Sequence, residues 1–283
     1  MGVSNLLVKA VDTFPRVRPG RTSRRKRRVE RADFIKQHSR PVTVGALLAR
    51  TQPLPEKSVL LGCCADGLPF LMAMDDPEMG AVLITGNRGS GKTHQLQVMV
   101  DAAIRTNRPH ELQITVITHN PSEWQAYQKD CRVDKHLQGL FAWYDPSLEG
   151  HIQHLTEMVE GRREGKMDGP ANLVILDDLN FVETLSPEAQ VNLRWLLEYG
   201  AQSRVWLVGA VSASQAQRLP FWMEVFRTRI FGWMPSDVEI DQPTRQPKLH
   251  PETLEPGTFR AWAGGSWITY QLPLLGDGIK WRV

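Results

Sequence analysis

Apolar and polar positions are arranged in two ways along this chain, and the difference separates strands from helices. From residue 81 onward, short runs that are apolar throughout alternate with longer segments whose apolar residues recur at helical spacing. The runs predict strands at 82–85, 112–118, 140–143, 173–176, 205–210 and 228–232. The segments between them predict helices at 92–106, 121–129, 148–164, 187–201 and 220–226. Strands that are apolar on both faces are typical of a parallel sheet covered by helices on both sides.

Two further pairs of apolar runs predict β-hairpins at the borders of this region. The run at 58–74 is interrupted by Asp66-Gly67, a pair typical of tight hairpin turns. The run at 257–275 is interrupted by Gly264-Gly265. The predicted fold class is therefore α/β, with a mostly parallel central sheet, flanking helices and peripheral β-hairpins.

The beginning of the chain differs from the rest in charge. Residues 1–40 contain twelve Lys and Arg against three Asp and Glu, a net charge of +9, although the whole chain carries only +3. The most basic stretch, 16–31, has no apolar face that could pack. We therefore expect a basic, flexible arm at 1–40 and one large domain at 58–283. The residues between them, 41–57, are expected to form a short helix (42–50) and a linker (51–57).

The basic arm has two interpretations. It could bind the phosphates of nucleic acid and release counterions, or it could be a solvated tail that at most docks on an acidic protein. The first interpretation is favoured. Because no aromatic residue interrupts the stretch at 16–31, base stacking is not expected there.

Apolar runs and cysteines suggest where the protein works. No run approaches the roughly 20 apolar residues that span a bilayer, and no apolar leader is visible. The three cysteines, Cys63, Cys64 and Cys131, form no disulfide framework and have no metal-binding spacing. We expect a soluble, cytoplasmic protein with reduced thiols. The nine scattered tryptophans are expected to anchor the core and interfaces.

The clearest chemical signal is the sequence GNRGSGKT, which joins the predicted strand at 82–85 to the predicted helix at 92–106. It fits the pattern G-x-x-x-x-G-K-[ST] in the strand–loop–helix context of a phosphate-binding loop. Its glycines let successive N–H groups point at phosphates, and the helix dipole adds positive potential. We expect Lys92 to reach the β and γ phosphates and the Thr93 hydroxyl to bind Mg²⁺. The nucleotide-binding candidates are Gly86, Asn87, Arg88, Gly89, Ser90, Gly91, Lys92 and Thr93.

A second motif, LVILDDLN at 173–180, ends an apolar strand in two acids. Asp177 is expected to hold Mg²⁺ through its water shell. Asp178 is expected to polarise the attacking water as a general base. Asp178 also has a plainer interpretation, as the cap of the next helix or an exposed side chain.

Two further groups of residues are candidates for sensing and stabilising the reacting phosphate. The apolar strand at 205–210 leads into small polar residues, of which Ser212 is the first candidate sensor, followed by Ser214 and Gln215. Arg229 is the first candidate for an arginine that reaches a neighbouring subunit's nucleotide. It could equally bind a carboxylate in its own subunit.

Arg227 and Arg204 are the other arginine candidates, because each stands at the start of a predicted strand. The candidate catalytic set contains only the first choices: Lys92, Asp178, Ser212 and Arg229.

The order of these parts resembles the FtsK–HerA superfamily of ring-forming, DNA-pumping ATPases, over roughly residues 58–275. The similar pieces are Gly62, Gly67 and Pro69 before the phosphate loop, then 157-EMVEGRREGK-166, 204-RVWLVGAVS-212, 229-RIFG-232 and 254-LEPG-257. The resemblance implies a RecA-like P-loop NTPase fold, ATP and Mg²⁺ as ligands, a hexameric ring with the nucleotide between subunits, and DNA in the pore. It indicates a compact relative without the membrane segment and winged-helix module of the cell-division translocase.

Three departures from the family pattern concern hydrolysis and not nucleotide binding. Asp178 replaces the usual Glu, Val211-Ser212 replaces a Thr-Gln sensor, and 118-THNPSEW-124 replaces an Asp-Pro-Lys turn. The favoured hypothesis is a ring-forming DNA translocase or packaging-type ATPase. The alternative is an ATP-gated DNA- or protein-binding switch with slow hydrolysis. A small-molecule kinase is disfavoured because no arginine-rich lid is visible and the arm would be unexplained.

Overall fold

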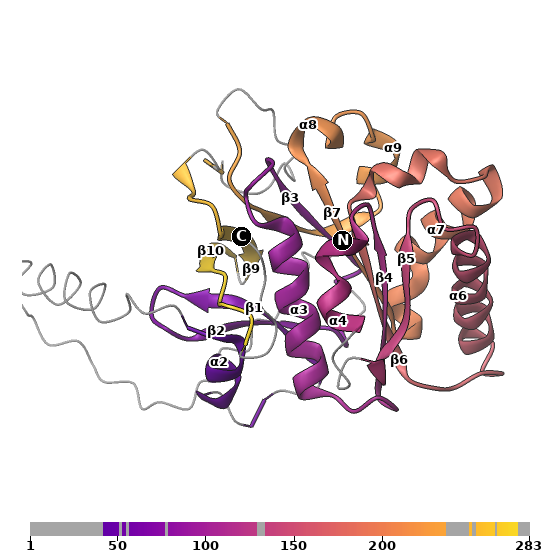
Figure 1. Ribbon diagram of the computed structural model, residues 1–283, viewed down its shortest axis with the longest axis horizontal. Coiled ribbons are helices and arrows are strands. Elements are labelled where there is room, and N and C mark those ends of the chain that lie inside the picture. The colour runs from indigo at the N-terminus through magenta and orange to yellow at the C-terminus, as the bar shows by residue number, and fades with distance from the viewer. Residues whose placement is uncertain are drawn as a thin grey trace, which may run out of the picture.

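One mixed β-sheet forms the centre of the computed structural model (Figure 1). The structure describes residues 42–50, 53–54, 57–76, 79–128, 134–235, 249–250, 253–263 and 265–276. The basic arm at 1–40 and Cys131 lie outside these ranges. Within them, ten strands pair in the order β2-β1-β10-β9-β8-β3-β7-β6-β4-β5.

Six neighbouring strands make up the parallel half of the sheet. They are β8 (Phe226–Phe231), β3 (Ala81–Gly86), β7 (Val205–Ser212), β6 (Ala171–Asp177), β4 (Leu112–Thr118) and β5 (Leu137–Ala142). β3, which leads into the phosphate loop, lies between β7 and β8. Residues of β3, β6 and β7 are buried along nearly their whole length, as expected for strands covered on both faces.

Two antiparallel hairpins extend the sheet beyond β8. They consist of β1 (Ser58–Cys64) with β2 (Pro69–Ala73), and β9 (Thr258–Ala263) with β10 (Ser266–Gln271). In the first turn, Cys64 N donates to the carbonyl oxygen of Leu68 at 2.8 Å, and Gly67 N donates to that of Cys64 at 2.9 Å. Gly67 has a positive φ of 84°, which a glycine adopts without strain. Both predicted hairpins and the mostly parallel α/β fold are thus confirmed.

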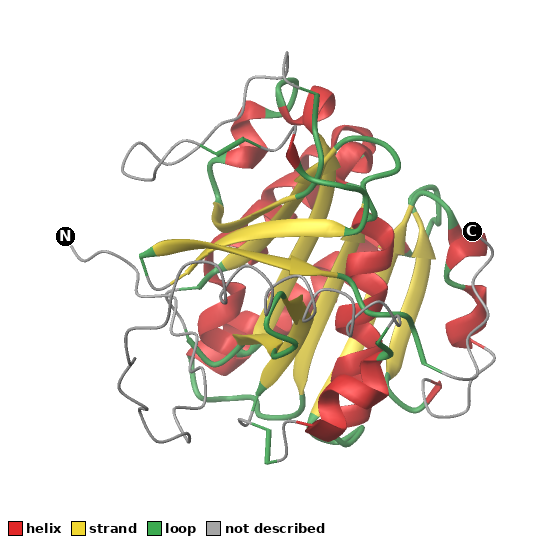
Figure 2. Cartoon of the chain, turned by 90° about the vertical axis from the view of Figure 1, so that its left-hand side faces the viewer, coloured by secondary structure: helices red, strands yellow, loops and turns green. Residues whose placement is uncertain are grey.

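Helices cover both faces of the parallel half, as Figure 2 shows. One face packs against α3 (Lys92–Thr106) and the short segment η1 (Pro121–Glu123) and α4 (Gln125–Gln128). The other packs against α6 (Leu148–Arg163) and α7 (Pro187–Tyr199). The remaining helical turns are η2 (Leu179–Thr184), η3 (Gly200–Ser203), α8 (Ala213–Ala216) and α9 (Pro220–Met223).

The region before the first strand contains a short helix, α2 (Val44–Arg50). Its residues Val44 and Leu47 are fully buried against Val98 and Ala102 of α3. The division of the chain into arm, linker and large domain stays a prediction. Among the described residues, no helix has the length and apolar character that crossing a membrane requires.

Three predicted elements have different limits in the structure. Within the described residues, the helix predicted at 121–129 is divided into η1, which ends at Glu123, and α4, which begins at Gln125; the buried Trp124 lies between them. The helix predicted at 220–226 ends at Met223, since Phe226 already pairs with Ala81 of β3. β5 spans 137–142 and not 140–143, because it pairs with β4 along that length.

Candidate nucleotide site

The carboxyl edge of the parallel sheet brings the predicted motifs together. In the parallel register, Gly86 of β3 lies beside Ser212 of β7, and Ala210 of β7 lies beside Asp177 of β6. Asp177 in turn lies beside Thr118, the last residue of β4. Motifs that are more than 80 residues apart in the sequence therefore meet at one edge, where ligands of open α/β sheets bind.

The phosphate loop turns at two glycines. Gly89 and Gly91 have φ angles of 80° and 99°, which side chains other than glycine rarely adopt. Gly86 is required for a different reason: a Cβ there would lie 2.5 Å from Ser90 Oγ. The loop thus has the glycine-dependent backbone that the sequence predicts.

Two other parts of the chain hold this loop by backbone hydrogen bonds. Asn87 N donates to the carbonyl oxygen of Trp233 at 2.8 Å, in the segment after β8. Gly257 N, in the turn before β9, donates to the carbonyl oxygen of Ser90 at 2.9 Å. The loop is therefore fixed from the side of the second hairpin as well as by β3 and α3.

Lys92 lies inside this loop. Its Nζ donates to the carbonyl oxygens of Gly86 at 3.0 Å and Asn87 at 3.1 Å. Burial lowers the pKa of Lys92 below its usual value, and the negative charges of Asp178 and Asp177 partly oppose that shift. A half-buried ammonium that contacts neutral carbonyl groups gains from an anionic ligand such as a phosphate.

Ser90 supplies a second indication that the loop fits phosphate. Its hydroxyl is buried and has no hydrogen-bond partner among the described residues. Buried polar groups normally have a partner, so an unpartnered hydroxyl inside a loop of this kind fits an oxygen-rich ligand. The cradle and its cation therefore suit the phosphates of a nucleotide.

Thr93 and Asp177 form the part of the site that suits Mg²⁺. The Thr93 hydroxyl, in the first turn of α3, donates to Asp177 Oδ1 at 3.0 Å. The indole N–H of Trp124 donates to Oδ2 at 3.0 Å. Two oxygens side by side, one of them a carboxylate, match the hard ligands that Mg²⁺ takes.

The pKa of Asp177 is raised to about 6. Burial is the main cause, and the negative charges of Glu123 and Asp178 add to it. The hydrogen bonds from Trp124 and Thr93 act in the opposite direction. A divalent cation would remove the main cost of this buried carboxylate by pairing with its charge.

Asp178 follows Asp177 across a cis peptide bond and caps the next element. Its Oδ1 accepts a hydrogen bond from Asn180 N at 3.0 Å, at the start of η2. The plainer interpretation, a capping role, is therefore present in the structure. The general-base role stays a prediction, and the second carboxylate oxygen is the one that would serve it.

The three candidate sensor residues lie together at the end of β7 and in the turn that follows it. Ser212 Oγ donates a hydrogen bond to Gln215 Oε1 and lies 3.4 Å from Ser214 Oγ. Because Ser212 is the register partner of Gly86, this cluster stands next to the first residue of the phosphate loop. The structure thus brings all three candidates to the site, and their role stays a prediction.

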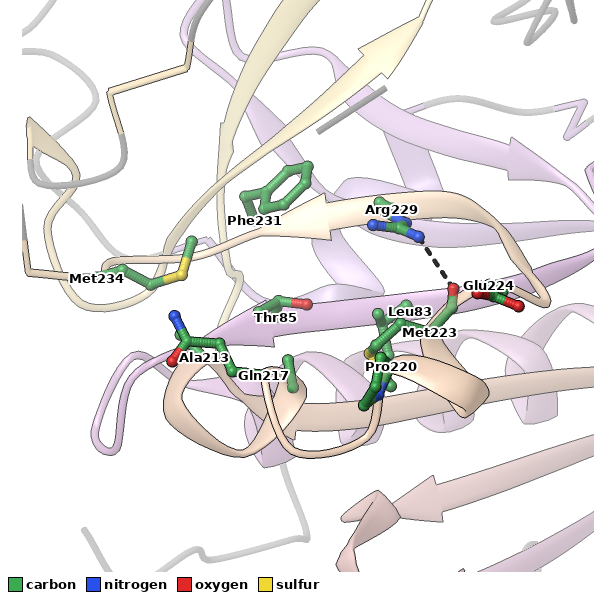
Figure 3. A pocket seen from close by; sticks show the side chains of 11 residues that line it. Leu83, Thr85, Ala213, Gln217, Pro220, Met223, Glu224, Arg229, Phe231 and Met234 are labelled. Carbon is green, nitrogen blue, oxygen red and sulfur yellow. Dashed lines mark hydrogen bonds between the residues drawn. The ribbon is translucent and has the colours of Figure 1, made fainter. Parts of the chain in front are cut away.

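Arg229 lies on β8, opposite Leu83 of β3, and its guanidinium binds within its own chain. Nη2 donates to the carbonyl oxygen of Met223 at 2.9 Å (Figure 3). The side chain lines a cavity of about 370 Å³ between these strands and the turns of α8 and α9. The expectation that Arg229 binds a carboxylate in its own subunit stays a prediction, as does its reach to a neighbouring subunit.

The other two arginine candidates lie elsewhere. Arg204 stands at the opposite end of β7 from Ser212 and forms an ion pair with Asp168. Arg227 is exposed near the start of β8, and its side chain packs against Gly80. Of the three arginines, Arg229 is therefore placed nearest the carboxyl edge.

Comparison with known proteins agrees with this geometry. The profile of the FtsK/SpoIIIE family matches residues 64–133, which include the phosphate loop, α3 and β4. None of the curated proteins compared matches the sequence. ATPases 2 and 3 of EccC from Thermomonospora curvata, solved with a signal sequence peptide, share the fold with a TM-score of 0.63 at 15% identity, over 83% of this chain and 44% of that one.

ATPases 2 and 3 of EssC from Geobacillus thermodenitrificans give a TM-score of 0.64 at 15% identity, over 89% of this chain and 50% of that one. The pCW3 conjugation coupling protein TcpA, in its monomer form with ATPγS, gives a TM-score of 0.51 at 14% identity, over 79% of this chain and 67% of that one. The family match and these shared folds support an FtsK/HerA-type P-loop ATPase domain. The RecA-like fold that the resemblance implies is confirmed.

The comparisons also set the extent of the likeness. The chain spans about half or less of the EccC and EssC chains that it matches. The family match, the fold and the phosphate loop together support an ATPase activity.

Sequence reasoning missed two features of the site. Trp124 was expected to anchor the core, but its indole N–H also donates to the carboxylate of Asp177. Its position six residues after β4, the strand beside β6, was the available signal. The contacts of Trp233 and Gly257 with the loop had no signal in the sequence, because they are made by backbone atoms.

Proposed function

We propose that this chain is an ATPase that assembles into a hexameric ring and couples hydrolysis of ATP to the movement or handling of DNA. The observation that supports it most is the meeting of Lys92, Thr93 and Asp177 at one sheet edge, beside Ser212. A phosphate cradle, a metal-binding carboxylate and a polar sensor are the parts that phosphoryl transfer to water requires.

Each residue of the site has a proposed role. Lys92 binds the β and γ phosphates, and its loop holds them through backbone N–H groups. Thr93 and Asp177 hold Mg²⁺, which when bound neutralises charge on the phosphates. Asp178 orients and polarises the attacking water with the oxygen that does not cap η2. Ser212, supported by Gln215, senses the γ phosphate.

Completion of the site by a neighbouring subunit is part of the proposal. Arg229 is the residue proposed to reach across, where its charge would stabilise the transferring phosphoryl group. To do so it must exchange its hydrogen bond to Met223 for one to the neighbour's nucleotide. Assembly would then control activity, because an isolated subunit lacks this cation.

DNA is the proposed partner because of the charge of the arm. The stretch at 16–31, which lies outside the described residues, carries a density of cations typical of phosphate binding. The arm at 1–40 would raise local DNA concentration, and the domain at 58–283 would act on the DNA through the ring pore. We place this activity in the cytoplasm, where ATP is available.

The experiment that tests the proposal is steady-state ATP hydrolysis against DNA concentration. We expect DNA to stimulate hydrolysis by the full chain, and Lys92→Ala to lose activity by at least about 100-fold. Lys166→Ala, which removes an exposed lysine paired with Glu164, is the matched control and should retain it. Removal of residues 1–40 should weaken the dependence of the hydrolysis rate on DNA concentration and leave the rate without DNA unchanged.

A second candidate function is an ATP-gated switch, and Asp178 favours it. This carboxylate is one methylene shorter than the usual Glu and already caps η2. Tight ATP binding with negligible turnover, with or without DNA, would support the switch and overturn the motor. A polypeptide partner then becomes the next candidate, since EccC is solved with a signal sequence peptide.

A further inference from the structure

Both oxygens of the Asp177 carboxylate are held, and the donors come from different elements. Thr93 Oγ1 donates to Oδ1 from the start of α3, and Trp124 Nε1 donates to Oδ2 from the segment after β4, both at 3.0 Å. The Thr93 hydroxyl is itself proposed to bind the metal. The bond from Trp124 is then the one that continues to hold the carboxylate when the metal is present.

The segment between β4 and α4 is built to direct the Trp124 ring toward the end of β6. Pro121 begins the single turn η1, and the side chains of Asn120 and Glu123 close it with a hydrogen bond of 2.9 Å. Trp124 N then donates to the carbonyl oxygen of Pro121 at 3.0 Å. The turn carries the indole into the core, where only 1% of Trp124 is exposed.

Two hydrogen bonds fasten this segment to α3 around Gln97. The Gln97 side chain donates to the carbonyl oxygen of Glu123 at 3.1 Å. The Tyr127 hydroxyl donates to the carbonyl oxygen of Gln97 at 2.9 Å. Since α3 begins at Lys92 and Thr93, the indole is fixed relative to the residues that would hold nucleotide and metal.

Another buried tryptophan shows that packing alone does not require such a bond. Trp206, at the start of β7, is also buried, and its indole N–H has no partner among the described residues. Trp206 lies toward the edge of the sheet opposite the one where Asp177 lies. The fold therefore accommodates a buried indole without an acceptor, and the aim of Trp124 at a carboxylate is a separate feature.

We propose that Trp124 is a positioning residue for the metal: it holds Oδ2 of Asp177 so that Oδ1 faces Thr93 and the Mg²⁺ site. The inference rests on the proposed nucleotide-dependent function and names a residue that orients its metal-binding carboxylate. Without the indole N–H, Oδ2 loses its donor in a buried place and the carboxylate can rotate. Partners of this kind typically change metal affinity by 10- to 100-fold when they are removed.

The test separates metal binding from nucleotide binding. Affinity for ATPγS is measured by calorimetry on the full chain, once with Mg²⁺ and once with EDTA, for wild type and Trp124→Phe. We expect similar affinities in EDTA, and a gain on adding Mg²⁺ that is smaller by about tenfold or more in the variant. Trp206→Phe, the same substitution at a buried indole without a partner, should leave the gain unchanged.

A double substitution checks that the effect passes through Asp177. In an Asp177→Asn background, Trp124→Phe should change the Mg²⁺ gain no further, because the charge that the indole orients is already absent. If Trp124→Phe fails to fold, 3-benzothienylalanine at position 124 keeps the ring shape and replaces N–H by sulfur. The same loss of the Mg²⁺ gain is expected for it.

The outcomes distinguish this inference from the proposed function. An unchanged Mg²⁺ gain in Trp124→Phe or its isostere overturns the positioning role while leaving the ATPase proposal intact. Equal losses of ATPγS affinity with Mg²⁺ and with EDTA also overturn the positioning role, since they indicate that Trp124 acts only in packing. If the wild type shows no Mg²⁺ gain at all, the proposed function fails together with the inference.

Discussion

At the scale of single residues, burial and charge conflict most strongly at Asp177. The carboxylate is placed at the end of a strand that is buried along its whole length, and two donors do not fully replace its lost hydration. Proteins commonly keep such costly groups where a ligand needs them. The conflict makes the free energy of unfolding depend on pH in a direction that can be worked out.

Substitution Asp177→Asn should stabilise the ligand-free protein at pH 8. The pKa of Asp177 is raised to about 6 in the folded state, so the folded protein binds the proton more readily than the unfolded chain. The free energy of unfolding of the wild type therefore rises as pH falls from above 6 toward 4. This contribution of Asp177, up to about 3 kcal/mol, is absent at pH 8. Thermal unfolding should show a higher Tm for the variant at pH 8 and convergence near pH 4.

Glu183→Gln, which changes an exposed carboxylate in η2, is the control and should follow the wild type. A constant difference in Tm between Asp177→Asn and wild type across this pH range would contradict the prediction.

A second residue, His151 of α6, makes stability depend on pH in the opposite direction from Asp177. Burial and the nearby His154 lower its pKa to about 4, and its Nε2 lies 3.0 Å from Thr115 Oγ1. Between pH 6.5 and 4 the unfolded chain binds a proton that the folded protein does not, so stability falls on acidification. His151→Gln should reduce that loss by about 1–2 kcal/mol, discounted for the partial exposure of the ring.

Urea unfolding of His151→Gln and wild type at several pH values between 7 and 4 measures the effect. Parallel curves for the two proteins would show that His151 does not titrate as its surroundings require.

At the scale of elements, short-range pattern fixed the long helices, and tertiary contacts fixed the short ones. α3 spans the predicted residues, and α6 and α7 end within two residues of their predicted limits. Ser186 caps α7 by accepting from Ala189 N, with Pro187 following it, which is a signal visible in the sequence. The segment at 121–129 lacked such agreement, because the burial of Trp124 interrupts the helical turn.

Gly150 in α6 offers a simple test of these element-scale rules. It lies in the first turn of α6, is exposed, and a Cβ there would meet nothing within 4 Å. Alanine loses less backbone entropy than glycine on forming a helix, so Gly150→Ala should stabilise the protein by about 0.5–1 kcal/mol.

Denaturant unfolding measures this gain, with ATP hydrolysis as a check that the site is unaffected. Gly86→Ala is the contrasting variant: its Cβ would lie 2.5 Å from Ser90 Oγ, so it should distort the loop and weaken nucleotide binding. A destabilised Gly150→Ala would mean that α6 begins later than the structure places it.

At the scale of the whole molecule, the proposed function requires assembly to complete the site. The described residues bring Lys92 and Asp177 together within one chain, while Arg229 binds the carbonyl oxygen of Met223. A ring in which Arg229 serves the neighbour's nucleotide makes a prediction about mixtures. Lys92→Ala and Arg229→Ala should each abolish hydrolysis, but a mixture of the two should regain part of it.

In a one-to-one mixture with random exchange, about a quarter of the interfaces combine an intact loop with an intact arginine. The mixture should therefore recover about a quarter of the wild-type rate, measured by steady-state hydrolysis after subunit exchange. Mixing Lys92→Ala with Lys92→Ala/Arg229→Ala supplies no intact loop and should recover nothing. Absence of recovery in the first mixture, with exchange demonstrated, would place Arg229 in its own subunit's chemistry.

The sequence by itself determined the parts of this protein that depend on local pattern. Apolar runs gave the strands, helical spacing gave the long helices, and GNRGSGKT gave the phosphate loop between β3 and α3. These features follow from backbone geometry and from chemistry carried by neighbouring residues, so a single sequence contains them.

Only the tertiary structure decided how distant parts meet. Strand order places Asp177 and Ser212 near the loop, and it brings the indole of Trp124 to a carboxylate 53 residues away. The supports from Trp233 and Gly257 use backbone atoms, which leave no trace in residue identity. Such contacts depend on which strands pair across long separations, and that pairing is set by packing of the whole sheet rather than by any local stretch.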